Sequence, residues 1–159
     1  MTMTGALADP DQPFAVFRAL EDQVRSSVGV RLFTLMQVDH DRGVAWRAYS
    51  NMPEAYPTSG EKPIPENIWT EQVLVRRETF VANSIDEIAA VFPDHALIQS
   101  LGCESCINIP VVIAGDVVGT MNCLDVAGHY TPEKLRAADA LIVPGALAFL
   151  LSQAGSASG

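Results

Sequence analysis

The sequence has little cysteine and no excess of positive charge. Three cysteines occur in 159 residues, an odd number that differs from the dense, even sets of small secreted disulfide proteins. Lysine and arginine number 10 against 19 aspartates and glutamates, which gives a net charge of −9. Such an acidic surface repels phosphate backbones and anionic lipids. The chain is therefore not expected to bind nucleic acid.

Targeting and membrane signals are also missing. The segment 1–12 has no basic region followed by an apolar one, as a signal peptide has. No uninterrupted apolar run reaches the roughly 18 to 20 residues that span a bilayer. Together with the odd cysteine count, these absences predict a cytoplasmic protein without membrane contact. At 48% hydrophobic and 18% charged residues, the chain has enough apolar material for one folded domain.

The chain is expected to form one domain with irregular ends. Residues 1–12 are predicted to be a flexible arm, residues 13–151 the folded domain, and residues 152–159 a flexible tail. Over residues 14–28 apolar side chains recur at helical spacing, and Gly29 is placed to end that helix.

The middle of the chain predicts a hairpin followed by an irregular region. Strand-like runs at 30–38 and 44–49 are joined by a short turn. The proline-rich stretch 50–65 is incompatible with regular structure and predicts a long ordered loop, a type of segment that often carries function. Short helices and a strand at 79–82 follow, and the run S-I-D-E at 84–87 is typical of a helix-starting capping box.

A second hairpin is the clearest element of the sequence. Its strands at 105–113 and 117–124 are apolar on both faces, which predicts a central position with cover on each side. The last helix is expected to begin after Thr131 as its N-cap, and Pro144 is expected to kink it.

This hairpin and its continuation resemble the closing half of a GAF domain. The first strand reads SCINIPV at 105–111, Gly119 lies on the return strand, and the last helix begins with YTPE at 130–133. In element order the resemblance covers residues 14–151, and in residue detail it covers mainly 100–135.

The resemblance implies an α/β fold of the α+β type, with a GAF/PAS-like antiparallel sheet of about six strands and helices on both faces. In such domains the first and last helices lie together on one face and often pair with those of a second copy, which implies a homodimer. The other face, roofed here by residues 50–102, would hold a small organic ligand. The implied function is a small-molecule-binding sensor or regulatory module; a ligand-free dimerisation module is an alternative.

Seven residues are candidates for ligand contact in that pocket. Aromatic and polar side chains gather in the proline-rich loop and on the roof, and two asparagines interrupt an otherwise apolar hairpin. An amide buried without a partner costs about 1 to 3 kcal/mol, so each asparagine needs a backbone, water or ligand partner. The candidates are Tyr49, Tyr56, Trp69, His95, Cys106, Asn108 and Asn122. No residue is assigned a catalytic or metal-binding role.

Thiol chemistry is the enzymatic alternative. The free methionine-R-sulfoxide reductases, a branch of the GAF family, are similar to this chain along the frame S-x-I-x-x-P. Their catalytic acid, however, falls at Cys106 here, and their paired aspartates fall at Asn122 and Leu124. Without those groups nothing protonates a departing sulfoxide oxygen. Cys106 and Cys123 are instead expected to be buried, reduced and on adjacent strands.

The sequence names no cofactor. In bilin-binding GAF domains the attachment cysteine would fall near Pro93, so a covalent bilin is not expected. His95 leaves a flat cofactor such as haem as an alternative, although a lone histidine at a helix start more often serves as a polar cap. A zinc site would need about four ligands, and a second C-x-x-C pair beside residues 103–106 is missing.

Overall fold

The computed structural model describes residues 2–157 of the chain. Helices and strands alternate irregularly along it, and two helical segments depart from α-geometry: η1 is a π-helix and η2 a 3₁₀-helix. The elements are α1 (Met3–Ala8), α2 (Phe14–Ser27), β1 (Leu32–Asp39), β2 (Val44–Ser50), β3 (Lys62–Pro63), α3 (Ile68–Thr70), η1 (Glu71–Val75), β4 (Phe80–Ala82), α4 (Ile85–Ala89), α5 (His95–Ser100), β5 (Ser105–Ile113), β6 (Asp116–Asp125), α6 (Pro132–Ala137), η2 (Ala138–Leu141) and α7 (Ile142–Ala157).

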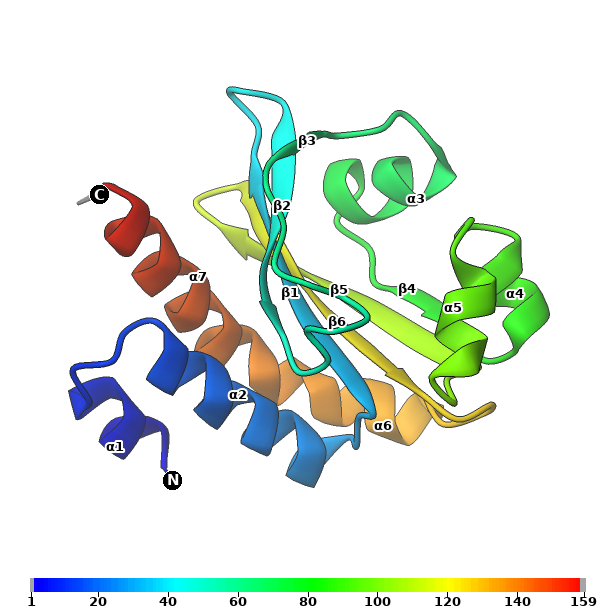
Figure 1. Ribbon diagram of the computed structural model, residues 1–159, viewed down its shortest axis with the longest axis horizontal. Coiled ribbons are helices and arrows are strands. Elements are labelled where there is room, and N and C mark those ends of the chain that lie inside the picture. Colours follow the sequence, from blue (N-terminus) through cyan, green and yellow to red (C-terminus); the bar gives the residue numbers. More distant parts are fainter. Residues whose placement is uncertain (1, 158–159) are drawn as a thin grey trace.

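Six strands form one sheet with the order β3-β2-β1-β6-β5-β4, and every neighbouring pair is antiparallel. The helices α1, α2, α6 and α7 lie on one side of this sheet, and α3, α4 and α5 lie on the other (Figure 1). The predicted α+β fold with about six antiparallel strands and helices on both faces is therefore confirmed.

The hairpin of β5 and β6 lies inside the sheet because both of its faces are apolar. Successive side chains point to opposite faces, so Met121 and Cys123 join the core under the terminal helices. Their neighbour Leu124 joins a second core under the opposite cover, together with Cys106. The sheet thus separates two apolar layers, as the sequence pattern predicts.

Close packing fixes the terminal helices on their face of the sheet. Phe149 of α7 is fully buried, and it lies so near Gly119 of β6 that a Cβ atom at this glycine would collide with its ring. The same Cβ would also lie 2.5 Å from the carbonyl oxygen of Met36. Glycine at this position therefore allows α7 to approach the sheet.

The segments predicted to be a flexible arm and tail each contain helix over the described residues. Thr2 caps α1 by accepting a hydrogen bond from the Gly5 amide, and Ala6 of this helix is fully buried. At the other end, α7 continues to Ala157, and the Ser152 hydroxyl donates to the buried Gln37 side chain at 2.7 Å. Packing and side-chain bonds hold the described parts of both segments, which composition alone does not reveal.

The last helix is interrupted where proline predicts it. The 3₁₀ segment η2 lies directly before α7, and Pro144 has no amide to donate back to Ala140. The stretch Pro132–Gly155 has a mean hydropathy of 1.6 and is long enough to span a membrane. Of its apolar 18-residue segment, 28% is buried. Its buried residues form part of the core on the sheet, whereas Val143 and Leu150 are exposed.

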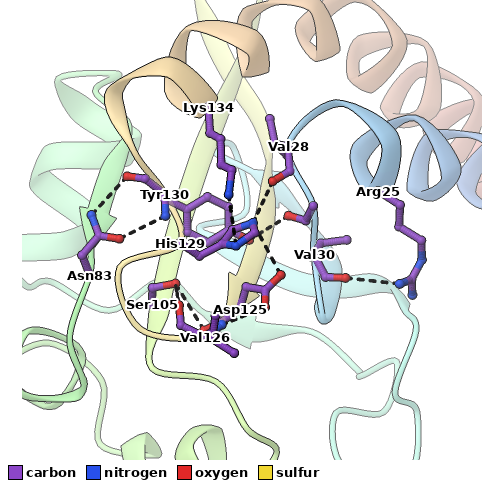
Figure 2. A network of polar contacts seen from close by, with 11 residues as sticks. Arg25, Val28, Val30, Asn83, Ser105, Asp125, Val126, His129, Tyr130 and Lys134 are labelled. Carbon is purple, nitrogen blue, oxygen red and sulfur yellow. Dashed lines mark hydrogen bonds and ion pairs between the residues drawn. The ribbon is translucent and has the colours of Figure 1, made fainter.

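A polar network at one corner ties the two covers of the sheet together (Figure 2). The His129 Nε2 atom lies 2.7 Å from the Val28 carbonyl oxygen at the end of α2. Its Nδ1 atom lies 3.3 Å from the Lys134 ammonium, which can only donate, so Nε2 carries the hydrogen. The backbone of fully buried Tyr130 exchanges two 3.1 Å hydrogen bonds with the Asn83 side chain. The YTPE segment is therefore a structural anchor.

Candidate functional site

A cavity of about 470 Å³ lies between the sheet and the cover formed by residues 50–102. Its floor comes from β1, β2, β5 and β6, and its walls and roof come from the irregular segments and from α3, η1 and α5. The residues that line it are Leu32, Thr34, Met36, Ala45, Arg47, Tyr56, Ile64, Pro65, Asn67, Trp69, Leu74, Val91, Phe92, Pro93, Asp94, Ile98, Cys106, Asn108, Asn122 and Leu124.

A row of polar side chains crosses the otherwise apolar floor. Asn108, Asn122 and Thr34 are direct cross-strand partners on β5, β6 and β1. The Asn108 Nδ2 donates to Asn122 Oδ1 at 2.8 Å, and the Asn122 Nδ2 donates to Thr34 Oγ1 at 3.1 Å. The row begins at the roof, where the indole nitrogen of Trp69 donates to Asn108 Oδ1 at 2.9 Å.

The indole sets the direction of the whole row. Because an indole N–H can only donate, Asn108 must turn its oxygen toward Trp69 and its nitrogen toward Asn122. The same orientation then passes to Asn122, whose nitrogen meets the hydroxyl of Thr34. Each amide keeps one N–H outside this row, and the Thr34 hydroxyl keeps its hydrogen. The floor therefore has hydrogen-bond donors available beside the cavity.

The charged part of the cavity surrounds Tyr56. The phenol of Tyr56 donates a hydrogen bond to Asp94 Oδ2, and the guanidinium carbon of Arg47 lies 5.0 Å from the centre of its ring. Burial raises the pKa of the phenol, as does the bond to the carboxylate. Burial also lowers the pKa of the Arg47 guanidinium. Tyr56 is therefore a protonated donor that holds two opposite charges beside one another.

Five of the seven predicted ligand-contact residues line the cavity and two do not. The five come from the loop, the roof and both strands of the central hairpin: Tyr56, Trp69, Cys106, Asn108 and Asn122. Tyr49 and His95 are not among the lining residues.

A β-bulge removes Tyr49 from the cavity. Arg47 pairs with Met36 and Tyr49 with Leu35, so Ala48 is an extra residue in the ladder. The bulge reverses the sheet face to which the following side chains of β2 point. The ring of Tyr49 therefore packs on the sheet face that the terminal helices cover, 5.5 Å from the ring of Phe17. Its phenol donates to Glu21 on α2 at 2.7 Å. The prediction for Tyr49 is therefore corrected: this residue joins β2 to a terminal helix.

His95 begins α5 and turns toward its own backbone. Its Nδ1 atom lies 3.1 Å from the carbonyl oxygen of Phe92, which only accepts, so Nδ1 carries the hydrogen. The lining set of the cavity contains no histidine, and His95 is therefore not available there as an axial ligand for haem. Over the described part of the chain, no group of three or more histidine, cysteine or acidic side chains is arranged to hold a metal ion.

All three cysteines are free and buried. Ile107 pairs with Cys123 and Cys106 with Leu124, which confirms that the two predicted cysteines lie on adjacent strands, although their side chains face opposite sides of the sheet. Burial raises the pKa of the Cys103 thiol to about 11 and that of Cys106 to about 12. Burial also raises the pKa of the Cys123 thiol. These groups are protonated at neutral pH and are poor nucleophiles.

Four polar residues of the cavity are absent from the sequence-based predictions: Thr34, Arg47, Asn67 and Asp94. Arg47 interrupts an apolar strand, and this is the one signal that marks it. Thr34 is typical of any strand, and Asp94 lies in a connection whose path depends on the fold. Only the pairing of β1 with β6 places Thr34 beside Asn122.

The chain has an antiparallel sheet with paired terminal helices on one face and an irregular cover over a cavity on the other. This arrangement defines a class of α+β domain. A profile of the GAF domain matches residues 15–149. The chain belongs to the GAF domain family, and nearly all of it is one such domain. A comparison with curated protein sequences gives no significant match.

Solved structures show the same fold at low sequence identity. The GAF domain of a two-component sensor histidine kinase from Bacillus halodurans has a TM-score of 0.68 and 13% identity, over 93% of this chain and 99% of that one. A GAF domain/HD domain protein from Geobacter sulfurreducens has a TM-score of 0.69 and 14% identity, over 87% and 93%. The free methionine-R-sulfoxide reductase from Neisseria meningitidis, in complex with its substrate, has a TM-score of 0.67 and 16% identity, over 96% and 86%.

Proposed function

We propose that this GAF domain is a sensor or regulatory module that binds a small organic molecule in the cavity under residues 50–102. The observation that carries the proposal is the pairing of an apolar cavity with a fixed row of polar groups. A volume of about 470 Å³ lies within the range of about 300 to 1,000 Å³ that is usual for small-molecule pockets. Such pockets combine mostly apolar walls with a few oriented polar groups.

The composition of the cavity favours a ligand that is partly aromatic or apolar. Trp69 and Phe92 form an edge-to-face pair with ring centroids 6.5 Å apart, and aliphatic side chains cover most of the remaining wall. Flat apolar groups pack well against such aromatic faces. A polyanion would find one cationic side chain, Arg47, among the lining residues, so nucleotides with several phosphates fit poorly.

Native mass spectrometry of freshly purified protein tests the proposal through a co-purified small molecule. The neutral fluorescent amine N-phenylnaphthylamine serves as a second probe after mild denaturation and refolding. Trp69→Ala should weaken binding of either molecule by about ten-fold or more, because the indole lines the cavity and orients the floor. Trp46→Ala is the matched control, since Trp46 pairs with Gln37 and alternates away from the cavity. Equal binding by the parent and Trp69→Ala would overturn the proposal.

A thiol-dependent enzyme related to the free methionine-R-sulfoxide reductases is the weaker candidate. Cys106 lines the cavity, but burial keeps its thiol protonated because it raises the pKa to about 12. The nearby polar row contains amides and a hydroxyl in place of carboxylic acids. Binding without thiol chemistry therefore has more support from this site.

We also propose that the domain acts as a homodimer in the cytoplasm, with its terminal helices as the interface. Over Ile142–Ala157 helix α7 carries no charged residue, yet Val143 is 78% exposed and Leu150 is 49% exposed. Phe14 at the start of α2 is 47% exposed. An apolar surface of this kind favours a self-complementary contact with a second copy. A signal from the cavity would then reach the partner copy through the sheet and these helices.

A further inference from the structure

Two opposite charges line the cavity, and no other lining residue carries a formal charge. Arg47 reaches it from β2, and Asp94 reaches it from the connection between α4 and α5. Ionised side chains at a half-buried position are costly unless they are paired. The formal charges of the two lining side chains sum to zero.

The two groups are held beside one aromatic ring without pairing with each other. Tyr56 donates its phenol hydrogen to Asp94 Oδ2, while its ring faces the Arg47 guanidinium at 5.0 Å. Among the described residues, the ion pairs within 4.0 Å do not include Arg47 with Asp94. Tyr56 thus contacts both the Arg47 guanidinium and the Asp94 carboxylate, which lie near each other without forming an ion pair.

Each charged group also keeps unused hydrogen-bonding atoms. The Arg47 side chain makes one hydrogen bond, from Nη1 to the Pro57 carbonyl oxygen at 2.9 Å, which leaves Nε and Nη2 without a protein partner in the described chain. Asp94 accepts from Tyr56 through Oδ2 alone, which leaves Oδ1. A guanidinium edge is suited to a carboxylate, and a carboxylate oxygen is suited to an ammonium group.

We propose that the cavity binds a small zwitterion of the α-amino acid type, with its carboxylate on Arg47, its ammonium group on Asp94 and an apolar or aromatic side chain directed toward Trp69. This proposal rests on the proposed function and narrows it to one class of ligand. A molecule with both charges neutralises both wall groups at once. A molecule with a single charge leaves either Arg47 or Asp94 desolvated beside it, which lowers its affinity.

The rest of the cavity suits the side chain of such a ligand. Trp69 and Phe92 offer aromatic faces, and Leu32 and Leu124 add an aliphatic floor beside the polar row. The free N–H groups of Asn108 and Asn122 are available to a side-chain oxygen or sulfur acceptor. An amino-acid ligand whose side chain is apolar, with or without one acceptor atom, therefore fits the cavity better than one whose side chain is charged.

Displacement of N-phenylnaphthylamine from the wild-type domain tests the ligand class directly. The competitors are L-leucine, L-methionine, L-phenylalanine and L-tryptophan. The amino acid that binds most tightly is then compared with two analogues of itself: the amine without the carboxylate and the acid without the amino group. We expect both single-charge analogues to bind about ten-fold more weakly or worse.

Two charge-neutralising variants turn this comparison into a crossover. Arg47→Gln should lower the affinity for the amino acid and the acid but not for the amine, and Asp94→Asn should lower the affinity for the amino acid and the amine but not for the acid. Glu54→Gln is the control and should change none of these affinities. Glu54 is an exposed acid in the loop that carries Tyr56, and it does not line the cavity. Circular dichroism confirms that each variant is folded.

The outcomes separate this inference from the proposed function. If the neutral probe binds and no amino acid displaces it at millimolar concentration, the zwitterion proposal is wrong while the cavity still binds small molecules. Equal affinity for the amino acid and its single-charge analogues would overturn it in the same way. If neither the probe nor a co-purified molecule occupies the cavity, both proposals are wrong.

Discussion

The indole N–H of Trp69 donates to Asn108 Oδ1 at 2.9 Å, and this single bond joins the roof of the cavity to its floor. Trp69 belongs to α3, which continues directly into the π-helix η1. Asn108 lies on β5, inside the sheet. Both partners line the cavity, so under the proposed function the bond would couple occupancy of the cavity to the position of the roof.

The first prediction concerns the direction of the polar row. Trp69→Phe removes the only donor that faces Asn108 Oδ1 in the row and leaves this oxygen without its partner. The free energy of unfolding should fall by about 1 to 2 kcal/mol, measured by urea denaturation. Trp46→Phe, on the other face of the sheet, should have a smaller effect, and an equal loss in both variants would argue against a role for the bond.

The second prediction concerns thiol reactivity. Cys103 and Cys106 should react slowly with a disulfide reagent in the native protein at neutral pH and rapidly after denaturation, because the folded chain buries them. Cys106→Ser should lower the free energy of unfolding by about 1 to 3 kcal/mol by burying a hydroxyl, without abolishing ligand binding. Fast modification of Cys106 in the folded protein would reopen the thiol-enzyme alternative.

The third prediction follows from the pKa of Cys106, which burial raises from its ordinary value near 9 to about 12. Between these values the unfolded chain loses the thiol proton while the folded chain keeps it. Stability is therefore full below pH about 9 and declines as the pH rises toward about 12, by up to about 1.4 kcal/mol per pH unit from this group. Cys106→Ala should show a shallower decline in urea titrations over this range; an unchanged slope would contradict the assignment.

The fourth prediction concerns Gly119. Gly119→Ala places a methyl group against the Phe149 ring and the Met36 carbonyl, which should cost about 1 to 3 kcal/mol through overpacking. Gly60→Ala is the control, since a Cβ atom at Gly60 meets no heavy atom within 4 Å. Thermal unfolding compares the two, and equal melting temperatures would mean that α7 moves away from the sheet at no cost.

The fifth prediction concerns the oligomer. Light scattering at micromolar concentration should give the mass of a dimer, and Val143→Glu should shift it toward the monomer because a charge would enter the apolar contact. Ile68→Glu is the matched control: Ile68 is 79% exposed, much like Val143 at 78%, but lies on the roof. A monomeric parent protein would rule out the proposed interface.

Much of the fold was determined by the sequence itself. Apolar periodicity over 14–28 produced α2, and the two-sided apolar pattern of 105–124 placed β5 and β6 inside the sheet. The capping residues Ser84 and Thr131 start their helices as local chemistry predicts, each accepting from an amide three residues ahead. These features depend on interactions within a few residues, and for that reason a pattern reveals them.

The site depended on contacts that no local pattern contains. The sequence indicated that Asn108 and Asn122 need partners, but only the register of three strands made them partners of each other and of Thr34. One extra residue in β2 turned Tyr49 toward the helices and left Arg47 in the cavity, and the path of the chain after α4 brought Asp94 to Tyr56. Local sequence specifies the elements because their bonds are short-range, whereas three of the hydrogen bonds that shape the cavity join residues 38 or more positions apart, which meet only through packing and register.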